Sequence, residues 1–352
     1  MQLLFVSTPV GPLGTGSGGG VELTIENCAL ALEQLGHQVT IAAPSGSTCG
    51  KFPVIQIDGA CQPSAQTEKQ SAFIVLPENS VLANLWSYAR SRQADYDIIL
   101  NFAYDWLPFY LTPFFSTPIF HLVSMASLTD SMDGAIARVV QEFPGTVAVH
   151  TRVQADTFTV AKQLQVIGNG FDLSRYTFCP DPEPILAWVG RIAPEKGLED
   201  SVAAAYLADL PLKIWGIMEN QDYWKQIRER YLNAPIFYEG FLPTTELQNQ
   251  LGRCQALLMT PRWIEAFGNV VIEALACGVP VIAYRRGGPG ELVESGKTGW
   301  LVEPDSVAGL VKAIGKLDQI NRAVCRQQAE ANFSLMALGV RLENWLLGCI
   351  PR

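Results

Sequence analysis

The chain has 352 residues, of which 48% are hydrophobic and 17% are charged, and its formal net charge is −9. Because this is too long for one ordinary hydrophobic core, the composition predicts two domains. Lys and Arg are outnumbered by Asp and Glu in both halves, seven against thirteen in residues 1–171 and eighteen against twenty-one in the remainder, which argues against binding to nucleic acid or an anionic membrane surface.

Neither a membrane span nor a secretion signal is predicted. No apolar run reaches the roughly 18 residues that a membrane-spanning helix needs, and the first basic residue is Lys51, so the charged start of a signal peptide is missing. The eight Cys residues form no C-x-x-C pair and are accompanied by only three His residues, which favours reduced thiols over a zinc cluster. We therefore expect a cytoplasmic protein with no bound metal and no cofactor.

In the first half of the chain, short β-branched runs alternate with helical patterns, as in parallel sheets joined by crossover helices. Strands are predicted at residues 3–7, 39–43, 98–102, 119–123, 146–149 and 165–167. Between the first strand and a helix at 21–35 lies the glycine-rich segment Gly14-Thr-Gly-Ser-Gly-Gly-Gly20. These glycines begin seven residues after the strand, and the second strand ends without an acidic residue for a ribose, so a dinucleotide-binding dehydrogenase is disfavoured.

Aromatic residues gather after the strand at 98–102, with seven of them among residues 101–115. Most are expected in the core. Tyr104, Asp105 and Trp106 lie at the turn from strand to helix, where Asp105 also suits a helix cap. A flat heteroaromatic ligand could stack there while the carboxylate accepts hydrogen bonds from ring N–H groups. His121 ends the stretch Pro118-Ile-Phe-His121 and is expected either at the cleft, where the carboxyl ends of strands point, or as a buried structural residue.

A break is predicted in the middle of the chain, where Pro180, Pro182 and Pro184 stand within five residues and oppose regular structure. A second alternation follows it, with strands predicted at 185–189, 212–215, 236–238, 256–260, 281–283 and 299–302. No segment repeats at a fixed period, so two doubly wound sheets are expected rather than a solenoid. The cleft between two such domains is the expected site.

Two carboxylates, Glu265 and Glu273, stand eight residues apart in the second half. Glu265 is predicted in a loop and Glu273 in the first turns of a helix that Asn269 could cap. The start of such a helix presents unpaired N–H groups and the positive end of a dipole, which suits a diphosphate. With hydroxyl groups bound by the two carboxylates, the pattern predicts a nucleotide-sugar site.

This segment resembles the E-x7-E carboxylate pair of the retaining glycosyltransferases of family 4, which have two Rossmann-like domains in the arrangement called GT-B. Residues 261–268 resemble the family's P-S-x-x-E-G-F-G, with Arg262 in place of Ser and Ala266 in place of Gly. Residues 190–197 resemble its G-R-x4-K-G, and Gly19-Gly-Val-Glu22 resembles its N-terminal glycine loop.

The resemblance implies a GT-B fold with an N-terminal acceptor domain at 1–171, a nucleotide-sugar donor domain at 172–332, and a helix at 333–352 that crosses back to the first domain. It implies a metal-independent enzyme that transfers a hexose with retention of configuration. Arg191 and Lys196 would bind the diphosphate, Glu265 the sugar hydroxyls and Glu273 the ribose, with His121 near the transferred sugar. The remaining donor contacts would come from a set of backbone groups: Gly18, Gly19, Gly20, Phe267, Gly268 and Asn269.

Within family 4, the first forty residues and the aromatic segment look most like the UDP-glucose:tetrahydrobiopterin glucosyltransferases. This likeness implies UDP-glucose as donor and a reduced pteridine as acceptor, held at Tyr104, Asp105 and Trp106. A lipid-linked sugar or another small alcohol is the alternative acceptor. Two other functions are a catalytically silent sugar-nucleotide-binding subunit, which the loss of a cation or carboxylate would favour, and a GT-B epimerase, which needs no acceptor.

Overall fold

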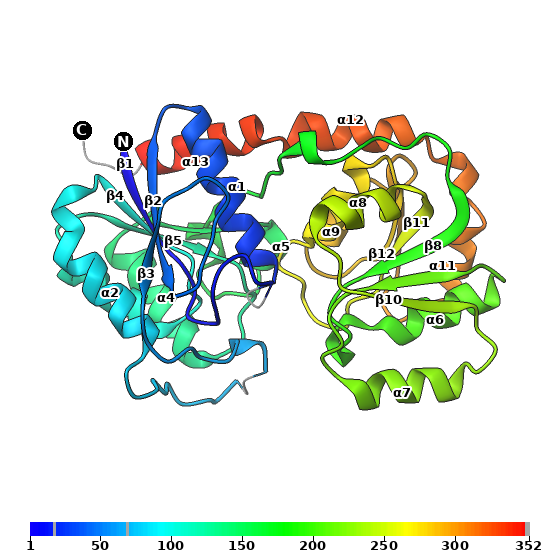
Figure 1. Cartoon of the computed structure of the whole chain (residues 1–352), viewed down its shortest axis with the longest axis horizontal. Coiled ribbons are helices and arrows are strands. Elements are labelled where there is room, and N and C mark those ends of the chain that lie inside the picture. Colours follow the sequence, from blue (N-terminus) through cyan, green and yellow to red (C-terminus); the bar gives the residue numbers. More distant parts are fainter. Residues whose placement is uncertain (17–18, 68–69, 349–352) are drawn as a thin grey trace. The chain divides into compact units, whose positions relative to one another are not determined.

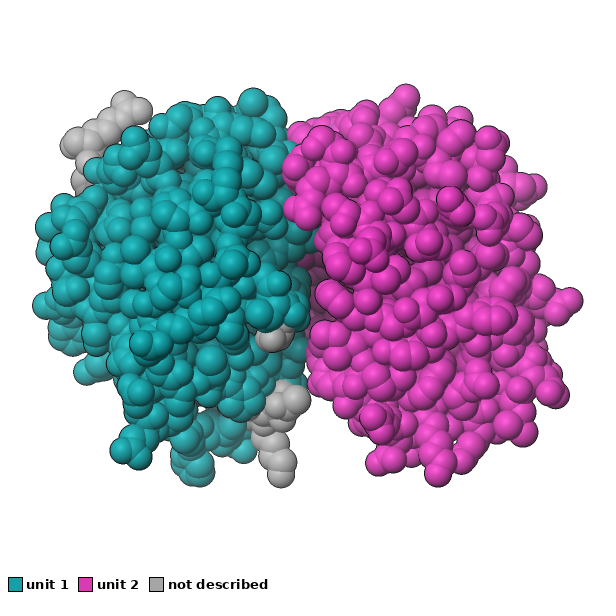
Figure 2. Space-filling model, in the orientation of Figure 1, with its two compact units in different colours: residues 1–170, 335–352 teal, residues 171–334 magenta. Residues whose placement is uncertain are grey.

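A computed structural model of the chain describes residues 1–16, 19–67 and 70–348. The chain forms two compact units, which Figure 2 colours separately: unit 1 consists of residues 1–170 and 335–352, and unit 2 of residues 171–334. Each unit contains one parallel sheet with helices packed against it (Figure 1). Among the described residues, no helix combines the length and the apolar character that a bilayer span requires.

The sheet of unit 1 has seven parallel strands in the order β3-β2-β1-β4-β5-β6-β7. The strands are β1 (Gln2–Val6), β2 (Gln38–Pro44), β3 (Val54–Ile57), β4 (Ile98–Asn101), β5 (Ile119–Val123), β6 (Val147–Val149) and β7 (Gln165–Val166). Leu3 pairs with Val39 of β2 on one side and with Ile98 of β4 on the other. The strand order therefore reverses at β1 and β4, as in a doubly wound sheet.

The helices of unit 1 cover both faces of this sheet. They are α1 (Gly20–Gln34), α2 (Val81–Arg92), α3 (Trp106–Leu111), α4 (Asp130–Glu142), α5 (Arg152–Ala155) and α13 (Leu335–Gly348). Because side chains alternate along a strand, Leu3 and Phe5 pack in the cluster that contains α1, while Leu4 and Val6 pack in the cluster that contains α2. Strand β1 is buried from Leu3 to Val6, as expected for a sheet covered on both sides.

The last helix, α13, lies along α1 although the two are far apart in the sequence, as the red and blue ribbons of Figure 1 show. Gly339 permits the close approach, since a Cβ atom there would lie 2.9 Å from the carbonyl oxygen of Ala31. Arg341 Nε donates to the carbonyl of Ile167 at 2.6 Å, and Trp345 Nε1 donates to that of Gly145 at 2.7 Å. Helix α13 is thus part of the core of unit 1.

Unit 2 has six parallel strands in the order β10-β9-β8-β11-β12-β13. The strands are β8 (Glu183–Val189), β9 (Leu212–Trp215), β10 (Ile236–Gly240), β11 (Cys254–Met259), β12 (Val281–Tyr284) and β13 (Gly299–Val302). The helices are α6 (Leu198–Leu207), α7 (Gln221–Arg230), α8 (Thr244–Gly252), α9 (Asn269–Ala276), α10 (Pro289–Leu292), α11 (Val307–Ile314) and α12 (Arg322–Phe333). The prediction of two doubly wound parallel sheets is confirmed.

The prediction that Pro184 stands outside regular structure is wrong, because β8 already begins at Glu183. Glu183 N donates to the carbonyl of Arg253 at 2.8 Å. The pairing with β11 then shifts by one residue between Cys254 and Ala256. A shift of this kind accommodates a proline, which has no N–H to give to the ladder.

The two ends of unit 2 pair with each other. Phe171 N donates to the carbonyl of Phe333 at 2.8 Å, and Phe171 forms an isolated parallel bridge with Ser334. Unit 2 is therefore one continuous segment that begins and ends at the same place, whereas unit 1 is assembled from two separate segments.

Candidate functional site

The loops that follow β8 and β11 are joined by hydrogen bonds beyond the carboxyl ends of these strands. Arg262 N donates to the carbonyl of Glu195 at 2.8 Å, and Thr260 Oγ1 donates to that of Gly197 at 2.7 Å. The loop after β12 joins them, since Gly288 N donates to the carbonyl of Glu265 at 2.7 Å. Ligands of doubly wound sheets bind at this edge. The three loops thus form one continuous surface that carries most of the predicted donor residues.

Two glycines allow these loops to approach so closely. A Cβ atom at Gly197, which has a φ of +63°, would lie 2.0 Å from the carbonyl oxygen of Thr260. A Cβ atom at Gly288 would lie 2.3 Å from the carbonyl oxygen of Phe267. Any larger residue at either position would push the loops apart.

The structure brings Lys196 and Glu265 together within this surface. Lys196 Nζ lies 2.6 Å from Glu265 Oε2, and the two side chains are 19% and 16% exposed. Trp263 Nε1 donates to the same oxygen at 3.1 Å, and Lys196 Nζ lies 4.6 Å from the centre of the Trp263 ring. Among the described residues, Glu265 Oε1 accepts no hydrogen bond. Lys196 and Trp263 therefore both bind Oε2 of Glu265, and Oε1 stays available to a ligand.

Arg191 lies at the start of the same loop as Lys196. Its Nη2 donates to Glu195 Oε1 at 3.0 Å, and its Nη1 forms an ion pair with Glu219. Both carboxylates are partly exposed, and exposed ion pairs contribute little to stability. A diphosphate that binds Arg191 would compete with these two carboxylates for the guanidinium group.

Helix α9 begins beside Glu265 with a backbone cap instead of a side-chain cap. Gly268 occupies the cap position with a φ of +92°, no side chain makes a capping hydrogen bond, and Asn269 is the first helical residue. The expectation that Asn269 caps the helix is therefore wrong, because the left-handed backbone at Gly268 already turns the chain into α9. Phe267, Gly268 and Asn269 together form the N-terminal approach to α9.

Glu273 lies in α9 and is only 7% exposed. The hydroxyl of Tyr176 donates to Glu273 Oε1 at 3.2 Å. Burial raises the pKa of Glu273 to about 6, and the hydrogen bond from Tyr176 and the charge of Arg175 oppose this rise. Among the described residues, its second oxygen accepts no hydrogen bond. Glu273 is therefore a buried carboxylate with one acceptor position still open.

The sequence missed the network around Arg262. Arg262 Nε lies 2.8 Å from Glu199 Oε1, and its Nη2 donates to Asp200 Oδ1 at 3.2 Å. The hydroxyls of Tyr223 and Tyr284 donate to these same two carboxylates. Arg262 thus ties the loop after β11 to the first turn of α6, which directly follows the loop that carries Lys196. The sequence did contain a hint of this network, because Arg262 stands where the resembled motif has Ser.

In unit 1, the glycine loop is closed by a carboxylate. Glu22 Oε2 accepts hydrogen bonds from Gly14 N at 2.7 Å and from Gly16 N at 3.1 Å. Gly19 occupies the cap position of α1 with a φ of +62°, and Gly20 is the first residue of that helix. Gly18 lies outside the described residues. The loop therefore has a defined backbone path at Gly19 and Gly20, which were both predicted to approach the donor.

His121 does not end its strand, because β5 continues to Val123. Its ring is fully buried and stacks on Phe109, with ring centres 4.0 Å apart. Asn101 Nδ2 donates to Nδ1 at 3.1 Å, so Nε2 carries the proton and donates to Thr112 Oγ1 at 3.0 Å. Burial lowers the pKa of His121 to about 3. His121 is thus a neutral residue with both ring nitrogens already bonded inside unit 1.

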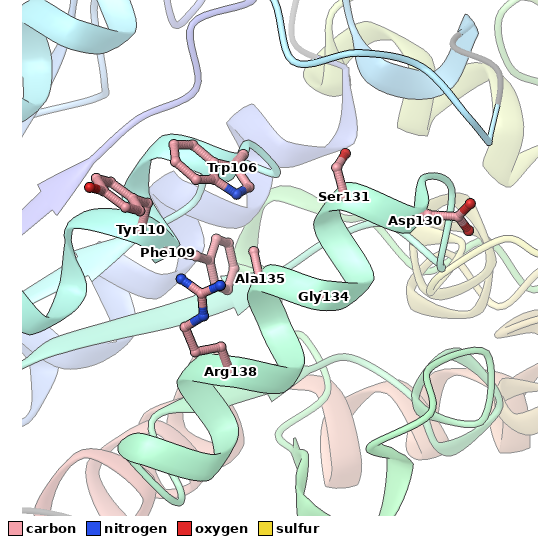
Figure 3. A pocket seen from close by; sticks show the side chains of 8 residues that line it. All are labelled: Trp106, Phe109, Tyr110, Asp130, Ser131, Gly134, Ala135 and Arg138. Carbon is pink, nitrogen blue, oxygen red and sulfur yellow. The ribbon is translucent and has the colours of Figure 1, made fainter.

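The three predicted acceptor residues do not share one wall. Tyr104 packs in the core, and its hydroxyl accepts a hydrogen bond from Leu128 N at 3.1 Å. Asp105 occupies the cap position of α3 but makes no capping hydrogen bond, while its Oδ1 accepts from Gln62 Nε2 at 3.4 Å. Trp106 starts α3, stacks on Tyr110 and lines a cavity between α3 and α4 (Figure 3). Of the three, Trp106 alone lines this cavity.

Comparison with known proteins identifies the class of enzyme. Residues 174–332 match the family model described as "Glycosyl transferases group 1". A glycogen synthase of Mycobacterium tuberculosis is 27% identical over 363 residues, which cover 89% of this chain and 85% of the synthase. A GDP-mannose-dependent alpha-mannosyltransferase of Mycolicibacterium smegmatis is 35% identical over 131 residues, which cover 37% of this chain and 33% of that protein.

Solved structures agree on the fold. Anabaena HepE in complex with UDP-glucose has a TM-score of 0.74 and 20% identity, covering 99% of this chain and 100% of HepE. Sucrose-phosphate synthase from Thermosynechococcus elongatus has a TM-score of 0.76 and 19% identity, covering 99% of this chain and 98% of the synthase. The chain has the GT-B fold, residues 174–332 match the group 1 glycosyltransferase model, and the protein is a glycosyltransferase.

Proposed function

We propose that this glycosyltransferase moves glucose from UDP-glucose to a small acceptor, a reduced pteridine, with retention of configuration and without a metal ion. The ion pair between Lys196 and Glu265 carries this proposal. It places a cation and a half-open carboxylate side by side, close to the start of α9 and in the same loop system as Arg191. A donor with a charged diphosphate and a hydroxyl-rich sugar needs both kinds of group.

The two cations suit the leaving group. When the bond between the sugar and the diphosphate breaks, negative charge builds on the diphosphate, and fixed cations stabilise that transition state more than the ground state. Lys196 uses one of its donors for Glu265 and retains two others. Arg191 would exchange Glu195 or Glu219 for phosphate oxygens, which are bidentate partners of a guanidinium group.

The carboxylates suit the hydroxyl groups. Glu265 Oε1 would accept hydrogen bonds from the sugar, and Glu273 would accept them from the ribose through its open oxygen. The N-terminus of α9 would add N–H groups and the positive end of the helix dipole for the diphosphate. The glycine loop of unit 1, at Gly19 and Gly20, would add contacts without side-chain clashes.

In the proposed reaction, the acceptor attacks C1 of glucose on the face from which the diphosphate leaves. The acceptor proton passes to a diphosphate oxygen, the C1–O bond to UDP breaks, and a new bond to the acceptor forms with the same configuration. No side chain is assigned as nucleophile. His121 is left out of these steps, because its ring is buried and both its nitrogens are engaged.

Two observations support the choice of substrates. Structural relatives include HepE in complexes with UDP and with UDP-glucose, and the first forty residues and the aromatic segment resemble enzymes that glucosylate tetrahydrobiopterin. A lipid-linked sugar or another small alcohol is the alternative acceptor. A silent binding subunit is the alternative to catalysis, but all four of Arg191, Lys196, Glu265 and Glu273 are present.

Mass spectrometry of the products tests the proposal. The enzyme is incubated with UDP-glucose and, in separate reactions, with tetrahydrobiopterin, phenols, short alcohols and a lipid-linked sugar, each with and without EDTA. We expect a glucosylated pteridine with an α linkage by NMR and the same rate in EDTA. Transfer only to another acceptor would replace the pteridine, a β linkage would refute retention, and UDP binding without any transfer would favour the silent subunit.

A further inference from the structure

A cavity of about 190 Å³ opens between α3 and α4 of unit 1 (Figure 3). One wall consists of aromatic rings from α3, and the other is a face of α4 that carries Ser131, Gly134 and Arg138. Both helices begin just after the carboxyl ends of their strands, β4 and β5. The cavity therefore begins near the edge of the sheet where ligands of doubly wound folds bind, at Trp106 and Ser131, and extends along α4 to Arg138.

The aromatic wall is formed by two nearly parallel rings. Trp106 and Tyr110 stand one helical turn apart on α3, and their rings stack with centres 4.4 Å apart and an interplanar angle of 17°. In the part of the chain that the structure describes, neither the indole N–H of Trp106 nor the hydroxyl of Tyr110 has a hydrogen-bond partner. A stacked pair of this kind offers an extended surface on which another planar ring can lie.

The opposite wall supplies a cation and open space. The guanidinium group of Arg138 extends from α4 toward the rings of α3 (Figure 3). Within the described residues it makes no ion pair or hydrogen bond, although the chain carries a net charge of −9. A Cβ atom added at Gly134 would meet no heavy atom within 4 Å, so this glycine leaves room beside Arg138.

The chemistry of these groups defines the ligand. An indole and a guanidinium group donate hydrogen bonds and accept none, so the matching ligand must be rich in acceptors. The planar fork of a guanidinium group fits two adjacent acceptor atoms. Asp130 also lines the cavity, but its Oδ1 accepts from Gln70 Nε2 at 3.0 Å, and its carboxylate points away from Arg138 (Figure 3).

We propose that this cavity binds the planar acceptor, with one ring face against Trp106 and an edge of two adjacent hydrogen-bond acceptors toward Arg138. Two sources present such an edge: the carbonyl oxygen O4 with the unprotonated nitrogen N5 of a pterin, and the carboxylate of an aromatic acid. Only the identification of the ligand as the acceptor rests on the proposed function, because binding to the cavity needs neither the donor nor turnover.

Three variants test the cavity. Arg138→Gln removes the fork and the charge. Gly134→Leu fills the space from a helical position whose backbone any residue can adopt. Arg92→Gln is the matched control, because it removes an exposed arginine of α2 that pairs with Asp95, and neither residue lines the cavity. Binding of pterin and of 4-hydroxybenzoate is measured by calorimetry without donor, beside binding of UDP.

We expect pterin, 4-hydroxybenzoate or both to bind the unmodified protein, and Arg138→Gln and Gly134→Leu to weaken that binding at least tenfold. Arg92→Gln should leave it unchanged, and all variants should bind UDP normally. Binding of only one probe identifies the source of the acceptor edge. The proposal is overturned if neither probe binds, or if both cavity variants bind them as well as the unmodified protein does. The proposed function fails separately, if glucose is transferred to no acceptor while the cavity still binds its probe.

Discussion

Lys196 and Glu265 are 69 positions apart in the sequence, yet Nζ of one lies 2.6 Å from Oε2 of the other at the edge of the second sheet. The contact exists because the loop after β8 and the loop after β11 are held together by backbone hydrogen bonds, which close approach at Gly197 permits. Two residues that the sequence predicted as separate donor contacts are thus partners in one ion pair.

Replacing either donor cation is expected to reduce catalysis strongly. Arg191→Ala or Lys196→Ala should lower kcat/KM by about 100-fold or more, since each would remove the proposed charge-assisted contact with the leaving diphosphate. Steady-state kinetics with circular dichroism as a check on folding measure this. Lys297→Ala is the control, because it removes an exposed lysine that pairs with Glu294. Near-normal turnover in both folded variants would remove these residues from the site.

Glu273 should make both stability and donor binding depend on pH. Burial raises its pKa from 4.5 to about 6, so the folded chain holds this proton more tightly than the unfolded chain does. Its contribution to stability is therefore complete below pH 4.5 and disappears as the pH rises through about 6, a change of about 2 kcal/mol. Glu273→Gln should remove this pH dependence. Compared with the unmodified protein at the same pH, the variant should therefore be more stable at pH 7.5 than it is at pH 5.

In the proposed role, Glu273 must be ionised so that its open oxygen accepts hydrogen bonds from the ribose. Affinity of the unmodified protein for UDP should therefore fall as the pH drops below about 6. Urea unfolding and UDP titrations at pH 5, 6 and 7.5 measure the two effects. A stability difference between Glu273→Gln and the unmodified protein that stays constant over this range would contradict the burial argument. UDP affinity that does not change with pH would show that Glu273 does not bind the ribose.

Arg262 is expected to act as a positioning residue. Arg262→Ser introduces the residue of the resembled motif but removes the bonds to Glu199 and Asp200. The side chain is 43% exposed, so the loss of stability should be limited to about 1 kcal/mol. The kcat should fall about tenfold, since the loop that carries Lys196 leads directly into the turn of α6 that this network holds. Arg262→Lys should restore only part of the rate, because a lysine cannot bond both carboxylates with a planar fork.

Replacing His121 is expected to lower stability but not turnover. His121→Leu should destabilise unit 1 by about 1–3 kcal/mol, because Asn101 and Thr112 lose a buried partner. Turnover of the folded variant at low temperature should stay within about threefold of the unmodified rate, a threshold set by the roughly 0.6 kcal/mol scale of thermal energy. Thermal melting and kinetics on the same preparation separate the two effects. A loss of kcat without a loss of stability would give His121 the catalytic role that the resemblance implies.

The sequence predicted the strands of both sheets well because buried parallel strands are continuous apolar runs. It missed β3, a short edge strand in which no residue is fully buried and Gln56 interrupts the apolar pattern. Such a strand owes its conformation to pairing with β2 rather than to its own residues. Pro184 was misplaced for a related reason, since only the pairing with β11 shows how a proline is accommodated in β8.

The candidate site was predictable where motifs specify residues and unpredictable where folding brings distant residues together. Spacing and the motif resemblance together singled out Glu265 and Glu273 as candidates. They could not show that Lys196 pairs with Glu265, that Arg262 bonds the start of α6, or that Arg138 of α4 faces Trp106 of α3. The bonding of both His121 ring nitrogens was equally hidden, because the positions of Asn101 and Thr112 in the folded chain decide it.

The way α13 returns to α1 has a consequence for biosynthesis. Unit 2 is one uninterrupted segment whose ends pair, so it can fold as soon as its own residues are available. Unit 1 cannot, because Trp345 must reach Gly145, 200 positions earlier, and Glu343 must reach His37, 306 positions earlier. Of the two units, unit 1 is therefore begun before unit 2 but completed after it, and until α13 is made its packing face on α1 is not covered by that helix.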